Sequence, residues 1–200
     1  MTTDLATAPD TRTPGPPDTR TPGPPDTTAP DAPDTAYTRL MRLLADHGVC
    51  PRVLDHPPEG GTAAVSLLRG HPLHQAAKCI VLRVRGAARP YVLAVVPGDH
   101  RVDIDAVRAL VGGTRAGFAD RHTAQRLTGC VSGAITPFSF DARLRLVVDT
   151  GLLDEEEIFF NAARLDRSLA VSTRDYRRIA APLVADISDR TAVQKATTAS

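Results

Sequence analysis

The first hydrophobic pattern along the chain predicts an amphipathic helix that begins near Tyr37. Leu40, Leu43 and Leu44 recur at the spacing that places apolar side chains on one helical face, and Gly48 ends the pattern. Four later segments also predict helices, because each begins at a capping residue or ends at a glycine. They cover residues 62–70, 103–111, 120–127 and 173–183.

Runs of β-branched and apolar residues predict the strands. The two longest, 78–84 and 91–97, are separated by a short polar stretch and indicate either a hairpin or two neighbouring core strands. Shorter runs predict further strands at residues 52–56, 144–149, 157–161 and 168–171. Strands and helices are mixed without regular βαβ alternation, so the sequence predicts an α+β domain with a mostly β core.

The first 34 residues have a different composition from the rest of the chain. The sequence PDTRTPGP occurs at 9–16 and again at 17–24, and Pro, Thr and Asp dominate. Such a segment buries too little apolar surface to offset its ordering entropy, so we expect a disordered leader that acts as a spacer or, alternatively, in recognition. The expected folded domain is 35–187, followed by a loose tail at 188–200.

Composition narrows the class of protein. The chain has 200 residues, 42% of them hydrophobic, which allows one packed domain. No apolar run approaches the roughly 18 residues of a membrane span, and the N-terminus lacks the apolar stretch of a secretory signal. Cys50, Cys79 and Cys130 are widely spaced and form no disulfide or Cys-x-x-Cys framework, so we expect a protein of the reducing cytoplasm with no membrane partner.

The net charge of +1 hides an asymmetry. Residues 1–34 contain six aspartates and two arginines, which gives −4. The other 166 residues contain 22 Lys+Arg and 17 Asp+Glu, which gives +5. A mildly basic domain is compatible with a polyanionic partner but does not require one.

The segment LTGCVSGAITPFSF, residues 127–140, predicts a shaped loop. Gly129, Gly133 and Pro137 disfavour a helix interior, and a strand tolerates them only at an edge or bulge. Glycine here lets the backbone approach another group closely. The identity of that group is the main functional question that the sequence raises.

A cysteine, a serine and two histidines are the first candidates for chemistry. Cys130 lies in the loop as a candidate nucleophile, although a small buried cysteine is the more common case. Ser132 does not match the nucleophile elbow G-x-S-x-G, because GCVSG places serine fourth. His71 and His74 have a spacing that does not suit a helical zinc pair, so no metal is expected.

Lys78 stands at the start of an otherwise apolar strand, in AAKCIVL. A lysine in this position is either an edge residue whose amine reaches solvent or a charge placed at a pocket. The residues alone do not favour one of these interpretations over the other.

Taken in order, AAKCIVL, YVLAVVPGDHRVD, LTGCVSGAITPF, LVVD and FFNA resemble the YbaK-like aminoacyl-tRNA deacylases. These are free-standing relatives of the bacterial prolyl-tRNA synthetase editing domain. The resemblance covers about residues 37–185, and the motifs FNA-x-x-LD-x-S and LTGCV-x-GAI are most similar to the branch that clears seryl- and threonyl-tRNA. It implies an α+β fold around a barrel-like sheet, and trans-editing without a metal or other cofactor.

The resemblance also implies site residues. The family lysine falls on Lys78, and the G-x-x-x-P loop falls on Gly133 to Pro137. We expect the loop backbone around Gly133 and Ala134 to bind the ester, with Lys78 directed at the terminal phosphate or the carbonyl and a ribose hydroxyl assisting the water. The expected substrate-binding residues are Cys130, Ser132, Ile135, Thr136, Pro137, Ser139, Asp149 and Asn161.

The chain departs from the pattern of that branch at three positions. Ser132 and Thr136 occupy loop positions where a bulkier residue and a proline are expected, and Ala163 stands where glycine is usual. We expect the small Ser132 to enlarge the pocket for threonine-like amino acids. The expected partner is the aminoacylated acceptor end of tRNA, with weak contact to a synthetase or elongation factor. A non-catalytic binding module and a Cys130 hydrolase are the alternatives.

Overall fold

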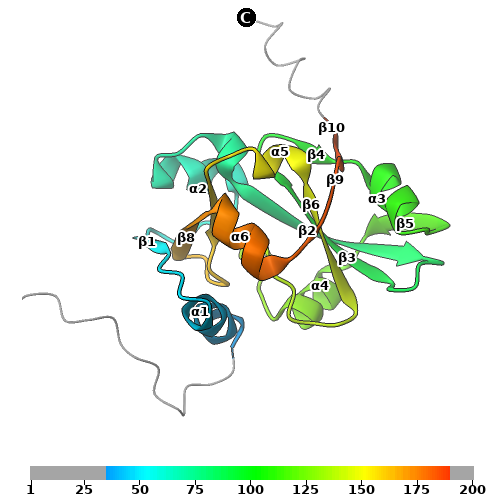
Figure 1. The fold of residues 1–200 in the computed structure, drawn as a ribbon, viewed down its shortest axis with the longest axis horizontal. Coiled ribbons are helices and arrows are strands. Elements are labelled where there is room, and N and C mark those ends of the chain that lie inside the picture. Colours follow the sequence, from blue (N-terminus) through cyan, green and yellow to red (C-terminus); the bar gives the residue numbers. More distant parts are fainter. Residues whose placement is uncertain (1–34, 190–200) are drawn as a thin grey trace, which may run out of the picture. The chain divides into compact units, whose positions relative to one another are not determined.

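The computed structural model describes residues 35–189, which fold as an α+β unit (Figure 1). The α+β class predicted from the sequence is confirmed. The leader 1–34 and residues 190–200 lie outside the described range, so the expectations about them remain predictions. The helices are α1 (Ala36–Asp46), α2 (Thr62–Arg69), α3 (Ile104–Leu110), α4 (Arg121–Thr128), α5 (Thr150–Leu153) and α6 (Thr173–Ala180), with one 3-10 turn, η1 (Leu73–Gln75).

The strands are arranged in three sheets. They are β1 (Arg52–Asp55), β2 (Ala77–Arg85), β3 (Tyr91–Pro97), β4 (Arg101–Val102), β5 (Arg115–Phe118), β6 (Leu144–Asp149), β7 (Glu157–Asn161), β8 (Arg167–Ser172), β9 (Leu183–Ala185) and β10 (Ser188–Asp189). A central five-stranded sheet has the order β5-β2-β3-β6-β9, a three-stranded sheet has the order β1-β8-β7, and β4 pairs with β10.

The central sheet is mixed. β2 pairs antiparallel with both β3 and β5, whereas β6 runs parallel to β3 and β9. The two long apolar runs of the sequence are therefore adjacent antiparallel strands, with Lys78 opposite Val96. A single parallel bridge between Ala76 and Phe159 joins this sheet to the three-stranded one. The expected barrel-like core thus takes the form of two sheets that meet near the start of β2.

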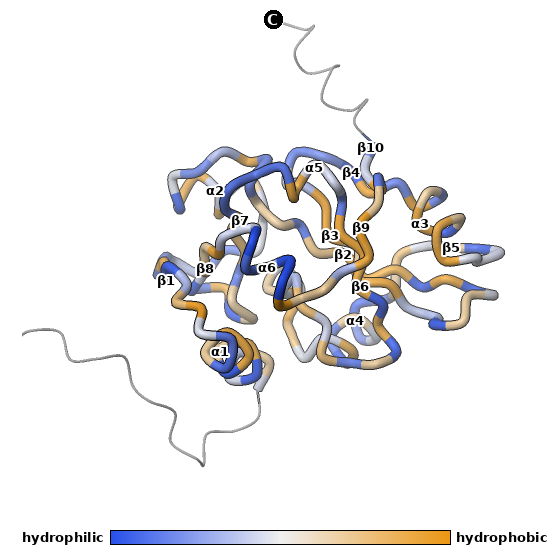
Figure 2. The backbone as a smooth tube through the Cα atoms, in the orientation of Figure 1, coloured by the Kyte–Doolittle hydropathy of each residue, from blue (hydrophilic) through white to orange (hydrophobic). Residues whose placement is uncertain are grey.

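The core lies on both faces of the central sheet. One apolar cluster includes Val81, Leu93 and Val95, and the other includes Leu82 and Val84 from the alternate positions. Side chains of successive strand residues point to opposite faces, so a strand buried on both sides is apolar throughout. Figure 2 shows this as hydrophobic colouring along β2, β3 and β6.

The predicted helix caps are present. Asp103 and Asp120 accept hydrogen bonds from Ala106 N and Thr123 N, at 2.9 and 2.8 Å, and so cap α3 and α4. Ser172 caps α6 by accepting from Asp175 N at 3.1 Å. Each cap satisfies an amide that the first helical turn leaves without a partner.

The C-terminal region differs from the prediction. The expected helix 173–183 ends at Ala180, and Ala181 adopts φ 40° as its cap. Pro182 explains the early end, because a proline disfavours helical geometry in the residue before it. Ser188 and Asp189, expected to begin a loose tail, instead form β10 against β4. The short elements β4, β5, β9, α5 and η1 were not predicted, because two- to four-residue segments carry little periodic signal.

Ala163 adopts a left-handed conformation with φ 60°. This conformation places the Cβ close to the following carbonyl oxygen and costs an L-residue about 1–2 kcal/mol. The usual glycine of this position would avoid that cost, so the departure noted in the sequence carries backbone strain.

Candidate active site

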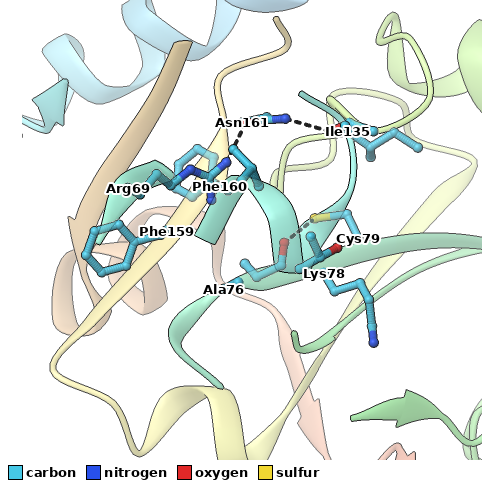
Figure 3. Close-up of a pocket in the computed structure, with 13 residues that line it drawn as sticks. Arg69, Ala76, Lys78, Cys79, Ile135, Phe159, Phe160 and Asn161 are labelled. Carbon is cyan, nitrogen blue, oxygen red and sulfur yellow. Dashed lines mark hydrogen bonds between the residues drawn. The ribbon is translucent and has the colours of Figure 1, made fainter. Parts of the chain in front are cut away.

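A cavity of about 170 Å³ lies where the start of β2 meets α2, β7 and the turn at Gly133 (Figure 3). This volume is below the range of about 300–1,000 Å³ found for drug-sized ligands, so it suits a group the size of an amino acid. The lining residues are Gly60, Thr62, Val65, Arg69, Ala76, Ala77, Lys78, Cys79, Gly133, Ile135, Phe159, Phe160 and Asn161. Of the predicted site residues, the cavity brings together Lys78, Gly133, Ile135 and Asn161.

Lys78 is half-buried, and its amine is held by backbone carbonyls. Nζ donates to the carbonyl oxygen of Gly98 at 3.1 Å and to that of His100. Burial lowers the pKa of Lys78, Asp99 opposes this, and Arg101 adds to it. In Figure 3 the side chain runs away from the Arg69–Asn161 pair. Lys78 thus lines the cavity, while its amine is tethered at the carbonyls of Gly98 and His100.

The turn at Gly133 requires glycine for two reasons. Its φ of +87° lies in a region that L side chains rarely adopt. A Cβ at this position would also lie 2.6 Å from the Cα of Gly60 and 2.9 Å from its carbonyl oxygen. The sequence predicted that the glycine brings the loop backbone close to the substrate ester, and the neighbour that the structure shows is the backbone at Gly60.

Backbone amides around this turn differ in their hydrogen bonding. The amide of Ala134 donates to the carbonyl of Val131 at 3.0 Å. Ala134, expected to take part in catalysis, therefore has its amide occupied within the turn. The amides of Gly133 and Ile135 have no acceptor within residues 35–189. These two amides are therefore not used by the hydrogen bonds of the described residues.

Asn161 holds the turn in place. Its Nδ2 donates to the carbonyl of Gly133 at 2.8 Å and to the carbonyl of Glu59 at 3.0 Å. Its Oδ1 accepts from Ser168 Oγ at 2.9 Å and from Arg69 Nη2. Asn161 is 5% exposed, so one buried amide fixes the two backbone segments that approach each other at Gly60 and Gly133.

Arg69 is the charged lining residue that the sequence analysis missed. It is 9% exposed, and its Nε donates to Ser168 Oγ at 2.8 Å. The signal was present in α2, where Ser66 and Arg69 are buried while Leu67 and Leu68 are 83% and 51% exposed. An amphipathic helix that buries its charge and exposes its leucines departs from the usual rule for soluble helices. The periodicity predicted the helix but not that Ser66 and Arg69 are buried beside Val65.

The charges of the lining have one sign. Lys78 and Arg69 are cationic, and no carboxylate is among the lining residues. Burying a charge without a partner costs several kcal/mol. The lining also includes the neutral polar side chains of Thr62 and Asn161, and its aromatic residue Phe159 stacks on His71 at 3.8 Å between ring centroids. The cavity therefore combines polar and apolar walls with two positive charges.

Two predicted residues of the loop are packed in the interior. The Cys130 thiol lies 3.5 Å from the carbonyl oxygen of Thr128, and burial raises its pKa. A raised pKa keeps the thiol protonated and disfavours nucleophilic use. Thr136 is 2% exposed, and neither residue is in the cavity lining.

Other predicted residues lie elsewhere. Ser139 Oγ donates to Leu144 O at 2.7 Å and lines a separate cavity, and the Pro137 carbonyl accepts from Tyr176 OH at 2.8 Å. Ser132 is exposed and outside the lining.

Asp149, expected to bind substrate, is 1% exposed and accepts from Gly151 N at 3.0 Å and from Ile187 N at 2.9 Å. Its two oxygens connect α5 to the C-terminal strands.

The two histidines considered for metal binding have other contacts. His71 stacks on Phe159, and His74 Nε2 lies 3.7 Å from Glu155 Oε2. Within residues 35–189, no group of three or more His, Cys, Asp or Glu side chains is arranged to hold a metal ion. None of the helices in this range combines the length and hydrophobicity that a bilayer crossing needs.

The structural role of Asp149 predicts a clear effect on stability. Replacing it by alanine leaves the amides of Gly151 and Ile187 without their acceptor, so D149A should lower the free energy of unfolding by about 3 kcal/mol. The neighbouring exposed Asp154 is the control, and D154A should change stability by less than about 0.5 kcal/mol. Urea unfolding measures both, and equal stability of the two variants would contradict this role.

Similarity to known proteins identifies the family of this chain. A family profile described as "Aminoacyl-tRNA editing domain" matches residues 56–179. The "Multifunctional Ser/Thr-tRNA deacylase ProXp-y" of Escherichia coli (strain K12) is 43% identical over 148 residues, which cover 73% of this chain and 89% of that protein. The protein of the same name from Escherichia coli O157:H7 matches to the same extent.

Two solved structures share the fold. "Crystal structure of hypothetical protein APE2540" superposes with a TM-score of 0.69 at 24% identity, covering 76% of this chain and 99% of that one. "Crystal structure of a putative trans-editing enzyme for prolyl tRNA synthetase" gives 0.67 at 20% identity, covering 82% and 99%. The resemblance seen in the sequence is confirmed, and the chain belongs to the aminoacyl-tRNA editing domain family.

Proposed function

We propose that this protein is a trans-editing deacylase that hydrolyses the ester of mischarged aminoacyl-tRNA, with a seryl, threonyl or threonine-like aminoacyl group. The observation that carries the proposal is the cavity in which the Gly133 turn, the tethered Lys78 and Asn161 meet. The Escherichia coli relative is named as a Ser/Thr-tRNA deacylase, and its similarity to this chain supports the choice of substrate.

The proposed chemistry uses the backbone rather than a reactive side chain. An aminoacyl ester is already activated, and attack by water places negative charge on the former carbonyl oxygen. The amides of Gly133 and Ile135, which have no acceptor within the described residues, are the donors for that oxygen. One such donor typically contributes about 3–4 kcal/mol to the transition state. A ribose hydroxyl of the terminal adenosine helps to position the water.

Asn161 and Lys78 have different roles in this proposal. Asn161 positions the turn by donating to the Gly133 carbonyl, so that the amides of Gly133 and Ile135 keep their direction. Lys78 supplies a fixed positive charge toward the ester carbonyl or the terminal phosphate. Two backbone carbonyls limit the motion of its amine, so little reorganisation accompanies the reaction.

Selection of the amino acid is assigned to the cavity lining. Ser132, Thr136, Cys130 and Ser139 were expected to line the pocket, but they lie outside it. The polar neutral side chains of the lining are Thr62, Cys79 and Asn161. A hydrogen bond to the hydroxyl of a seryl or threonyl group discriminates far more strongly than a fit to one methylene. Thr62 is the lining hydroxyl that we propose for this contact.

The partner in this proposal is the acceptor end of tRNA, and the compartment is the cytoplasm. A charge of +5 outside the leader favours weak binding dominated by phosphate contacts. We further propose a weak contact with a synthetase or an elongation factor, which would present the mischarged end. The cysteine-hydrolase alternative is disfavoured by the buried, protonated thiol of Cys130.

A panel of charged tRNAs tests the proposed function. Under single-turnover conditions, the protein should release serine and threonine from their tRNAs faster than alanine or proline, because the latter lack a side-chain hydroxyl. Amino-acid release is measured by acid precipitation of the remaining charged tRNA. Binding without release would identify a non-catalytic module, and faster release of alanine or proline would contradict the proposed selectivity.

The role of Lys78 predicts a loss of rate without unfolding. K78A should lower the single-turnover rate by about 100-fold or more, the size of effect seen when one preorganised electrostatic group is removed. Arg42, an exposed residue of α1, provides the control, and R42A should retain the wild-type rate. A folded K78A with near wild-type turnover would show that the lysine has another role.

A further inference from the structure

The last residue of α2 places a guanidinium in the wall of the cavity without a counter-ion. Arg69 donates to Ser168 Oγ and to Asn161 Oδ1, and both acceptors are neutral. No carboxylate within residues 35–189 forms an ion pair with it. These two hydrogen bonds use two of the five N–H donors of the side chain.

The surroundings of Arg69 leave its charge uncompensated. Burial lowers its pKa to about 10, so the side chain remains cationic at neutral pH. Lys78 differs, because Asp99 raises its pKa and offsets part of the effect of burial. Burial lowers the pKa of His71, the Pro72 carbonyl and Glu157 oppose this, and the charges of Arg69 and Arg52 add to it. Arg52 pairs with Glu157 at 2.5 Å, whereas Arg69 has no acidic partner within the described residues.

The charges of an aminoacyl-tRNA end can be compared with this lining. The α-ammonium of the amino acid is positive, and the phosphodiester that precedes the terminal nucleoside is negative. Two cations and no carboxylate in the lining favour the binding of the phosphodiester. Arginine also suits the task, because its planar fork matches two phosphate oxygens at once, whereas lysine acts as a point charge.

We infer that Arg69 binds the phosphodiester on the 5′ side of the terminal nucleoside, an inference that rests on the proposed function. Asn161 and Ser168 hold the guanidinium from behind, which fixes its orientation before substrate arrives. The same contacts connect the phosphate to the Gly133 turn, because Asn161 also holds the Gly133 carbonyl. Lys78 is then left for the ester carbonyl.

The test compares 5′-AMP with adenosine as probes, because they differ by one phosphate. Dissociation constants are measured by NMR titration for the wild type, R69Q, R69K, K78A and the surface control R42Q. The wild type should bind 5′-AMP about 10-fold more tightly than adenosine, because hydrogen bonds to charged groups are the strong ones. R69Q should lose that preference and keep its affinity for adenosine, R69K should keep part of the preference, and R42Q should keep all of it.

The ratio of the two affinities separates phosphate binding from a structural role. A variant that merely disturbs the fold weakens both probes and leaves the ratio unchanged. If R69Q does not fold, R69K provides the test. It keeps the positive charge but loses the paired donors of the guanidinium, so the ratio of the affinities for 5′-AMP and adenosine should fall. An unchanged ratio in R69Q or R69K, or a wild type that does not distinguish the probes, overturns the inference. Loss of the preference in K78A but not in R69Q would also overturn it.

The outcome is independent of the deacylation assay. If the protein fails to release amino acids but R69Q loses the preference for 5′-AMP, the proposed function is wrong and the phosphate site stands. If release occurs and the preference does not depend on Arg69, the inference about the phosphate is wrong and the proposed function stands.

Discussion

The candidate site depends on the close approach of two backbone segments, at Gly60 and at Gly133. This approach is closer than any side chain at Gly133 would permit, because a Cβ there would lie 2.6 Å from the Gly60 Cα. Asn161 stabilises the approach by donating to a carbonyl on each segment. The turn is thereby held by two segments that are distant from it in sequence, and its amides at Gly133 and Ile135 keep a fixed direction. Preorganised donors of this kind are effective because they need no reorganisation when charge develops on the substrate.

The charges of the cavity lining also carry a cost in stability. A cavity that buries Arg69 and Lys78 without a carboxylate in its lining gives up stability that an ion pair or an apolar side chain would have provided. Sites for anionic ligands commonly carry such a cost, because the ligand supplies the missing charge. Helix α2 produces this arrangement, because it buries Arg69 and leaves Leu67 exposed.

Much of the fold could be predicted because the strands and caps have local signals. The β2–β3 pair and the caps at Asp103 and Asp120 follow from periodicity and residue type. The family resemblance assigned the lysine to Lys78, and the glycines and proline of residues 127–140 predicted the turn at Gly133. Contacts between distant segments could not be predicted. Asp149 looked like a site residue in the linear motif, yet its oxygens bind backbone amides at positions 151 and 187.

The most direct measurement of the central claim compares alanine at two glycines with similar backbone angles. Gly133 and Gly112 have φ of +87° and +71°, but only Gly133 has a backbone segment within reach of an added Cβ. G112A therefore bears only the conformational cost, whereas G133A must also displace Gly60 and redirect the amides. Single-turnover deacylation by the folded variants should fall about 100-fold or more in G133A and stay near the wild-type rate in G112A. A folded G133A that deacylates as fast as G112A would contradict the account.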